Sequence, residues 1–178
     1  MNRWMGHWFY PFAVGVLFGV VQTAYFIQLN FALASPYGTF LMVTLAWLTG
    51  SIVGLRLSQA RRFALSAGPL ICIVPYFVTL IILGALPFRA DVWPLYGVLV
   101  LVSGVFSGLF FGRLAEIVQP VRRLFFMENN GFLAGIAICT LAFLLLGRTV
   151  LWVLPLLLAV VSWASTPRQG DRLSPVTN

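Results

Sequence analysis

The chain has very little charge and no lysine. Its 178 residues include eleven arginines and four carboxylates, and charged residues make up 8% of the sequence against 61% hydrophobic residues. Soluble domains carry about 25% charged residues. A chain this apolar could not cover its surface with polar side chains, so its composition predicts a protein whose solvent is largely lipid.

The positive net charge of +7 does not indicate nucleic-acid binding. That activity needs a basic face on a folded soluble domain, whereas these arginines lie between apolar runs. Such placement is typical of residues that set membrane topology and contact anionic lipid head groups. We therefore expect the bilayer and anionic lipids as partners, and no nucleic acid.

Residues that carry out catalysis or hold metals are also scarce. The only histidine is His7, and the only cysteines, Cys72 and Cys139, lie inside apolar runs without a CxxC spacing. The sequence offers no Ser–His–Asp set, paired carboxylates, phosphate loop or metal cluster. We expect no enzymatic activity, no metal site and no cofactor bound by this chain alone. The sequence does not decide whether a pigment, quinone or haem of a partner contacts the aromatic surface of this chain.

Six apolar segments are long enough, or nearly so, to cross about 30 Å of hydrocarbon as helices. They are Trp8–Leu29, Tyr37–Leu57, Ala64–Leu86, Trp93–Gly112, Phe125–Gly147 and Thr149–Ser165. The last is the shortest, and its short link to the fifth predicts a helical hairpin. The sequence thus predicts an all-α, six-helix transmembrane domain over residues 1–165, with a retained first span, and a flexible polar tail over residues 166–178.

The arginines divide unevenly between the two ends that six spans would create. If both termini lie on one side, that side carries nine arginines and the other carries only Arg89 and Arg148. Cytoplasmic loops of membrane proteins are enriched in arginine and lysine. We therefore expect both termini in the cytoplasm.

Small residues concentrate in four of the six segments. Their glycines repeat at GxxxG spacing: Gly15 and Gly19; Gly50 and Gly54; Gly104, Gly108 and Gly112; Gly131 and Gly135. This spacing places the glycines on one helix face, where two backbones can approach closely. The third and sixth segments carry prolines instead. The pattern predicts that helices 1, 2, 4 and 5 pack tightly and that helices 3 and 6 are peripheral.

Two of these glycine motifs resemble those of a known family. They are Trp-Leu-x-Gly-x-x-x-Gly, formed by Trp47, Leu48, Gly50 and Gly54, and Glu-x-x-Gly-x-x-x-Gly, formed by Glu128, Gly131 and Gly135. With the stretch QTAYFIQLNFALASPYGTF, they resemble the membrane domain of bacterial membrane-bound spermidine-synthase-like proteins, over roughly Phe12 to Leu158. The resemblance implies a six-helix unit similar to half of a major-facilitator-type transporter in the bacterial inner membrane. The sequence contains no synthase domain, so that activity is not implied.

A charge cluster is expected at the cytoplasmic end, made of Arg56, Arg113, Glu116, Arg122, Arg123 and Glu128. Glu128 precedes the fifth apolar run, together with Asn129 and Asn130. Such side chains favour the start of a helix, where they meet free N–H groups and the positive end of the dipole. The nearby arginines could also neutralise Glu128. The alternative is a carboxylate that binds a proton, a cation or a lipid head group.

Two further sets of side chains have both a structural and a functional interpretation. Arg113 and Glu116 are three residues apart, which favours a local ion pair on one helix face; the alternative is a gate-like charge lock with Glu128 and Arg56. Gln22, Thr23 and Gln28 lie in the first segment. They could join helices by hydrogen bonds or line a substrate path.

Two functions follow from these observations. The first is a non-catalytic membrane subunit or scaffold that packs within a larger complex. The second is a half-transporter that acts on a small solute, as a homodimer or with a partner half.

Overall fold

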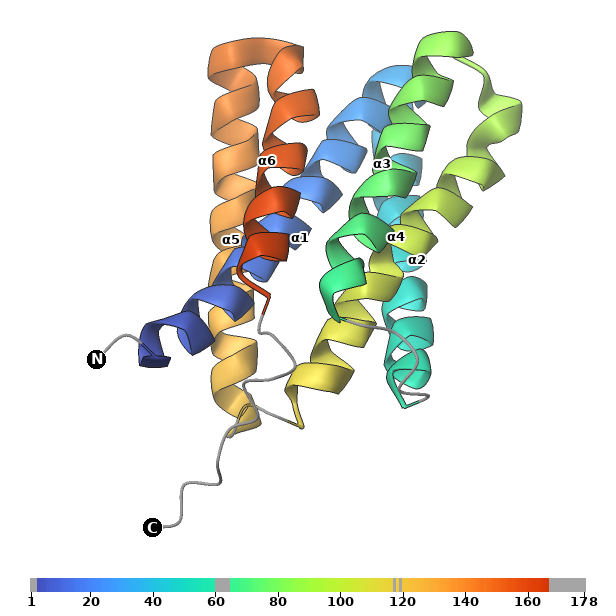
Figure 1. The fold of residues 1–178 in the computed structure, drawn as a ribbon. Coiled ribbons are helices and arrows are strands. Elements are labelled where there is room, and N and C mark those ends of the chain that lie inside the picture. The colour runs from blue at the N-terminus through green and yellow to red at the C-terminus, as the bar shows by residue number, and fades with distance from the viewer. Residues whose placement is uncertain (1–2, 60–64, 117, 119, 167–178) are drawn as a thin grey trace.

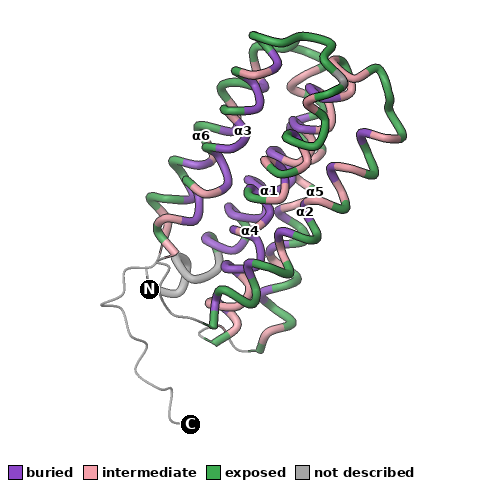
Figure 2. Tube along the Cα trace, turned by 90° about the vertical axis from the view of Figure 1, so that its right-hand side faces the viewer, coloured by how far each residue is buried: buried purple, intermediate pink, exposed green. Residues whose placement is uncertain are grey.

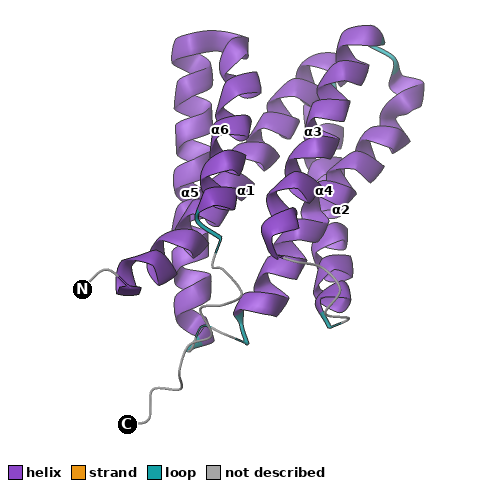
Figure 3. Cartoon of the chain, viewed as in Figure 1, coloured by secondary structure: helices purple, strands orange, loops and turns teal. Residues whose placement is uncertain are grey.

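The protein is a bundle of helices. The computed structural model describes residues 3–59, 65–116, 118 and 120–166, apart from the side chains of residues 3–8 and 90. No strand is present in these ranges (Figure 3). The helices are α1 (Arg3–Leu33), α2 (Pro36–Ser58), α3 (Gly68–Ala85), α4 (Trp93–Leu114), α5 (Val121–Leu146) and α6 (Val150–Ala164), with 3-10 turns η1 (Leu65–Ala67), η2 (Ala90–Val92) and η3 (Gly147–Thr149). The all-α prediction is confirmed. The side chain of His7 and tail residues 167–178 lie outside the described part.

Proline and glycine set several of the helix boundaries. α2, α3 and α4 each have a proline in the first turn, where a missing N–H costs nothing and the fixed φ suits the helix. α5 ends at Leu146, and the next residue, Gly147, has a φ of 72°, in the left-handed region that glycine enters without a steric cost. The chain therefore reverses at this point, and α6 runs back along α5 (Figure 1).

Five segments are long and apolar enough to cross a membrane. They are Phe9–Leu33, Pro36–Ser58, Leu65–Ala85, Trp93–Leu114 and Val121–Ala164. The prediction of six such helices is wrong in this count. α6 has only 15 residues, or about 22 Å at a rise of about 1.5 Å per residue. It follows α5 through the three-residue turn η3, and together the two helices and this turn form one apolar segment of 44 residues.

The helices form two groups of three. α1 packs against α5 and α6, and α4 packs against α2 and α3. The groups meet where α1 contacts α2 and α3, and where α3 contacts α6. α1 begins and α6 ends at one end of the bundle, which we call the terminal end; the connections 34–35, 86–92 and 147–149 lie at the opposite, distal end (Figure 1).

α1 is the central helix of the bundle. In its most apolar window 72% of the residues are buried, compared with 50% for α3 and for α4, 22% for α2 and 17% for the segment containing α5 and α6. Figure 2 shows buried positions along the inner faces of α1, α3 and α4. The prediction that α3 is peripheral is therefore wrong. α3 packs without glycine pairs, because its buried face consists of larger side chains such as Ile73, Tyr76 and Leu80.

Aromatic rings join the two groups. The Phe18 ring of α1 lies edge-on to Trp47 of α2 and to Phe106 and Phe110 of α4, at centroid distances of 5.9, 5.3 and 5.9 Å. Edge-to-face pairs contribute about 0.5–1.5 kcal/mol beyond burial of their area. This cluster therefore fixes α1 against α2 and α4, where the glycine contacts do not reach.

Candidate functional site

The α1–α5 interface is built on glycines. A Cβ at Gly15 would overlap the backbone carbonyl oxygen of Glu128, and one at Gly19 would overlap that of Phe132. In return, Gly131 and Gly135 face the carbonyl oxygens of Phe12 and Val16. From one contact to the next, the position moves four residues toward the C-terminus on both helices, so α1 and α5 run parallel. Their backbones meet through Cα–H···O contacts, as in close pairs of membrane helices.

The α2–α4 interface repeats this arrangement. Gly50 and Gly54 lie against the carbonyl oxygens of Leu101 and Val105, and Gly104 and Gly108 against those of Trp47 and Ser51. Gly112 lies against the Ser58 side chain. The sequence pattern thus marks two separate parallel pairs, rather than one four-helix group.

Two serines at the α2–α4 interface have a role that glycine spacing does not reveal. The Ser51 hydroxyl lies 2.8 Å from the Ser107 hydroxyl and donates to the Trp47 carbonyl at 2.9 Å. Helix-to-helix bonds of this kind can form only when the backbones are already close. Ser51 directly follows Gly50 and Ser107 directly precedes Gly108, and this adjacency to the paired glycines is the signal in the sequence.

The charge cluster lies at the terminal end without forming ion pairs among its described members. The Arg56, Arg122 and Arg123 side chains are exposed, and Glu116 is exposed as well. Within the described ranges, the only ion pair joins Arg89 and Asp91 at the distal end. The expected Arg113–Glu116 pair and the charge lock with Glu128 and Arg56 are therefore not formed.

Glu128 is not at the start of a helix. α5 begins at Val121, directly after the extended residue Pro120, so Glu128 lies in its third turn and cannot cap free N–H groups. The Asn130 Nδ2 donates to the Phe126 carbonyl at 2.6 Å, whereas a capping side chain would accept from a free N–H group at the helix start. The Glu128 side chain is 6% exposed, and among the described residues no arginine pairs with it. Its burial follows from its place on the glycine face of α5.

The three polar residues of the first segment do not form one path. Gln22 and Thr23 are half-buried, and Gln28 is 1% exposed. Six residues turn an α-helix by about 240° beyond full turns, so Gln22 and Gln28 point in different directions. Gln28 contacts Arg148 instead, whose Nε donates to the Gln28 Oε1 at 2.9 Å. Gln28 thus joins α1 to the link between α5 and α6.

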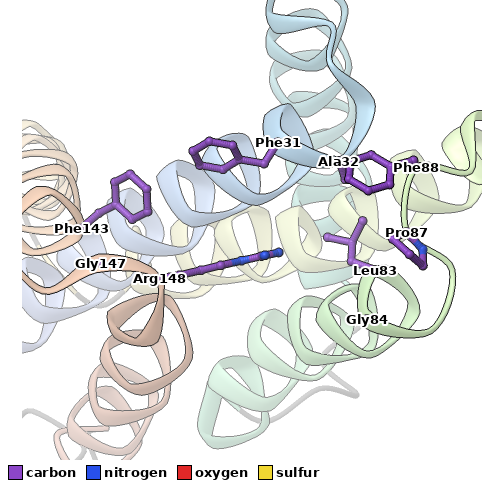
Figure 4. Close-up of a pocket in the computed structure, with 9 residues that line it drawn as sticks. All are labelled: Phe31, Ala32, Leu83, Gly84, Pro87, Phe88, Phe143, Gly147 and Arg148. Atoms are coloured by element: carbon purple, nitrogen blue, oxygen red, sulfur yellow. The ribbon is translucent and has the colours of Figure 1, made fainter.

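A pocket of 650 Å³ opens beside this contact at the distal end. Its walls are largely apolar, and come from Phe31 of α1, Leu83 of α3, Phe88 before η2 and Phe143 of α5. Figure 4 shows the Arg148 side chain extending across it between these groups. The pocket gathers residues from three separate stretches of the chain, 31–32, 83–88 and 143–148, and no local sequence pattern marks it.

Comparison with protein-family models, with curated proteins and with solved structures gave no match to this chain.

Proposed function

We propose that this chain is a multi-pass integral membrane protein that serves as a non-catalytic subunit or scaffold of a larger membrane complex. In this proposal, the terminal end and both termini face the cytoplasm across a bacterial inner membrane. Arg56, Arg113, Arg122 and Arg123 all lie at that end, in agreement with the enrichment of arginine on the cytoplasmic side.

The large unused apolar surface is the observation that carries this proposal. Only 17% of the most apolar window of the α5–α6 segment and 22% of that of α2 is buried. Leu133, Leu145 and Phe126 are 64%, 81% and 63% exposed. Lipid and partner helices are the surroundings that suit such surfaces.

The test is purification of the tagged chain in mild detergent, followed by native mass measurement and an absorbance scan. The proposal expects a large assembly that contains other subunits, and deletion of the gene should lower the amount of that assembly. Elution of the chain alone, as a monomer or dimer, would overturn the subunit role.

A half-transporter is the second candidate, favoured by the repeated packing of the helices. α1 pairs with α5 and α6 as α4 pairs with α2 and α3, and the resemblance to spermidine-synthase-like membrane domains implies such a unit. Here the protein would act on a small solute, and Glu128→Gln should abolish uptake without lowering protein yield. A lowered yield with unchanged uptake per molecule would leave Glu128 a structural role only.

A further inference from the structure

Arg148 carries the one positive charge at the distal end that no described carboxylate neutralises. Two arginines lie at this end, and Asp91 pairs with Arg89. The other described carboxylates, Glu116 and Glu128, lie in the connection after α4 and in the third turn of α5, both at the terminal end. Arg148 donates its Nε to the neutral Gln28 oxygen, which orients the guanidinium but leaves its charge uncompensated.

The groups around Arg148 can hold an anion. A guanidinium has five N–H donors, and the bond to Gln28 uses one of them. An oxygen of a phosphate or carboxylate in the pocket can accept from the guanidinium donors that Gln28 does not use.

The rest of the pocket suits an apolar chain. Phe31, Leu83 and Phe143 form its walls, and Phe88, 76% exposed, stands at its edge. Phe88 has a φ of 61°, a strained backbone conformation for a bulky residue, and such conformations cluster at functional sites. This backbone conformation holds an aromatic ring beside a cationic pocket.

We propose that the distal pocket binds the phosphate head group of an anionic lipid, with the phosphate against Arg148 and acyl chain carbons against Phe31, Phe88 and Phe143. This inference rests on the proposed membrane location, but not on the subunit role. The distal end then lies at head-group depth, where arginine and aromatic side chains meet lipid phosphates. A soluble anion would use only the guanidinium and leave the apolar walls empty.

Native mass spectrometry of the purified chain tests the site. The protein is released from neutral detergent after equilibration with phosphatidylglycerol or, as a neutral probe, with phosphatidylcholine of the same chains. The wild type should retain phosphatidylglycerol, and Arg148→Gln should retain one molecule fewer, with an affinity for that last molecule lowered at least about tenfold. Phe88→Ala should weaken the same binding step.

Arg89→Gln is the matched control, because it removes an arginine at the same end whose charge Asp91 already neutralises. It should keep the wild-type lipid count. Equal counts for wild type and Arg148→Gln would overturn the site. If inorganic phosphate alone prevents phosphatidylglycerol at the same concentration from binding, the site takes a free anion, and the lipid assignment is overturned. Either result leaves the proposed subunit role untouched. If the chain elutes alone and Arg148→Gln still lowers its lipid count by one, only the subunit role is refuted.

Discussion

The Tyr76 hydroxyl of α3 donates a hydrogen bond of 2.6 Å to the Leu151 carbonyl of α6. Leu151 lies four residues before Pro155, inside α6. A proline has no N–H, so it leaves the carbonyl four residues earlier without its helical donor. Tyr76 supplies that donor from a neighbouring helix, and both residues are fully buried. The proline of α6 and the tyrosine of α3 therefore form one structural unit.

Replacing Tyr76 with phenylalanine should destabilise the fold by about 0.5–2 kcal/mol, the range found for hydrogen bonds between membrane helices. Pro155→Ala should restore a helical N–H for Leu151, so Tyr76→Phe should cost less in that background. Unfolding in mixed micelles measures both values and their coupling. Tyr37→Phe is the control, since Tyr37 is 75% exposed. An identical cost of Tyr76→Phe in both backgrounds would contradict the shared role.

Gly108→Ala should push α2 and α4 apart. Its Cβ would overlap the Ser51 carbonyl oxygen and the Leu55 amide nitrogen, and backbone atoms cannot move aside as the end of a flexible side chain can. We expect a loss of about 1–3 kcal/mol in the free energy of unfolding, as for overpacked cores, measured by thermal or denaturant unfolding in micelles.

Gly97→Ala on the same helix is the matched control. The nearest atom to its Cβ would be the Met42 Cγ at 3.7 Å, which is an ordinary contact. Because alanine has a higher helix propensity than glycine, this variant should be neutral or slightly more stable. Equal losses at both positions would mean that the α2–α4 contact is not the limiting one.

These glycines show how far sequence reasoning reaches. GxxxG spacing reveals which helix faces allow close approach, because an absent side chain is visible in the sequence. It does not reveal which face meets which, since the pairing of Gly15 with α5 and of Gly50 with α4 depends on the whole bundle. Gln28 and Arg148 are 120 residues apart, so neither spacing nor periodicity could connect them.

The prediction that Glu128 lies at a helix start is wrong for a different reason. Polar Glu128, Asn129 and Asn130 precede the long apolar run, and this contrast favours a helix start there. Pro120 is the stronger signal, because proline is common at the first positions of helices and rare inside them. The helix begins directly after it, and this placement moves Glu128 from a helix end to a buried face.

The Glu128 carboxylate gains nothing from an ion pair within the described residues, so neutralising it should not weaken the fold. Burying an unpaired charge is costly, and glutamine keeps the shape of the side chain. Glu128→Gln should therefore leave the unfolding free energy unchanged or raise it, and exposed Glu116→Gln should have almost no effect. A loss of more than about 1 kcal/mol for Glu128→Gln alone would show that the carboxylate has an attractive partner.

The Arg89–Asp91 pair predicts a small pH dependence at the distal end. The hydrogen bond from Arg89 lowers the pKa of the Asp91 carboxyl below its usual value. The pair therefore stabilises the folded protein above about pH 4, and this contribution is lost as the pH falls through the lowered pKa. The chain has two aspartates, so carbon NMR of aspartate-labelled protein should resolve the titration, which Arg89→Gln should shift upward. No upward shift would contradict the pairing in solution.

Cysteine labelling can decide the proposed orientation, because both native cysteines are buried and should react slowly. Pro87 and Gln59 are exposed residues at the distal and terminal ends. A membrane-impermeant maleimide should label Pro87→Cys in intact spheroplasts and Gln59→Cys only after the membrane is opened. The reverse pattern would place the arginine-rich end outside, against the enrichment of arginine in cytoplasmic loops.

The same reagent can test whether the short helix α6 crosses the bilayer. Ser165→Cys should be labelled in the same way as Gln59→Cys only if α6 brings the chain back to the terminal side of the bilayer.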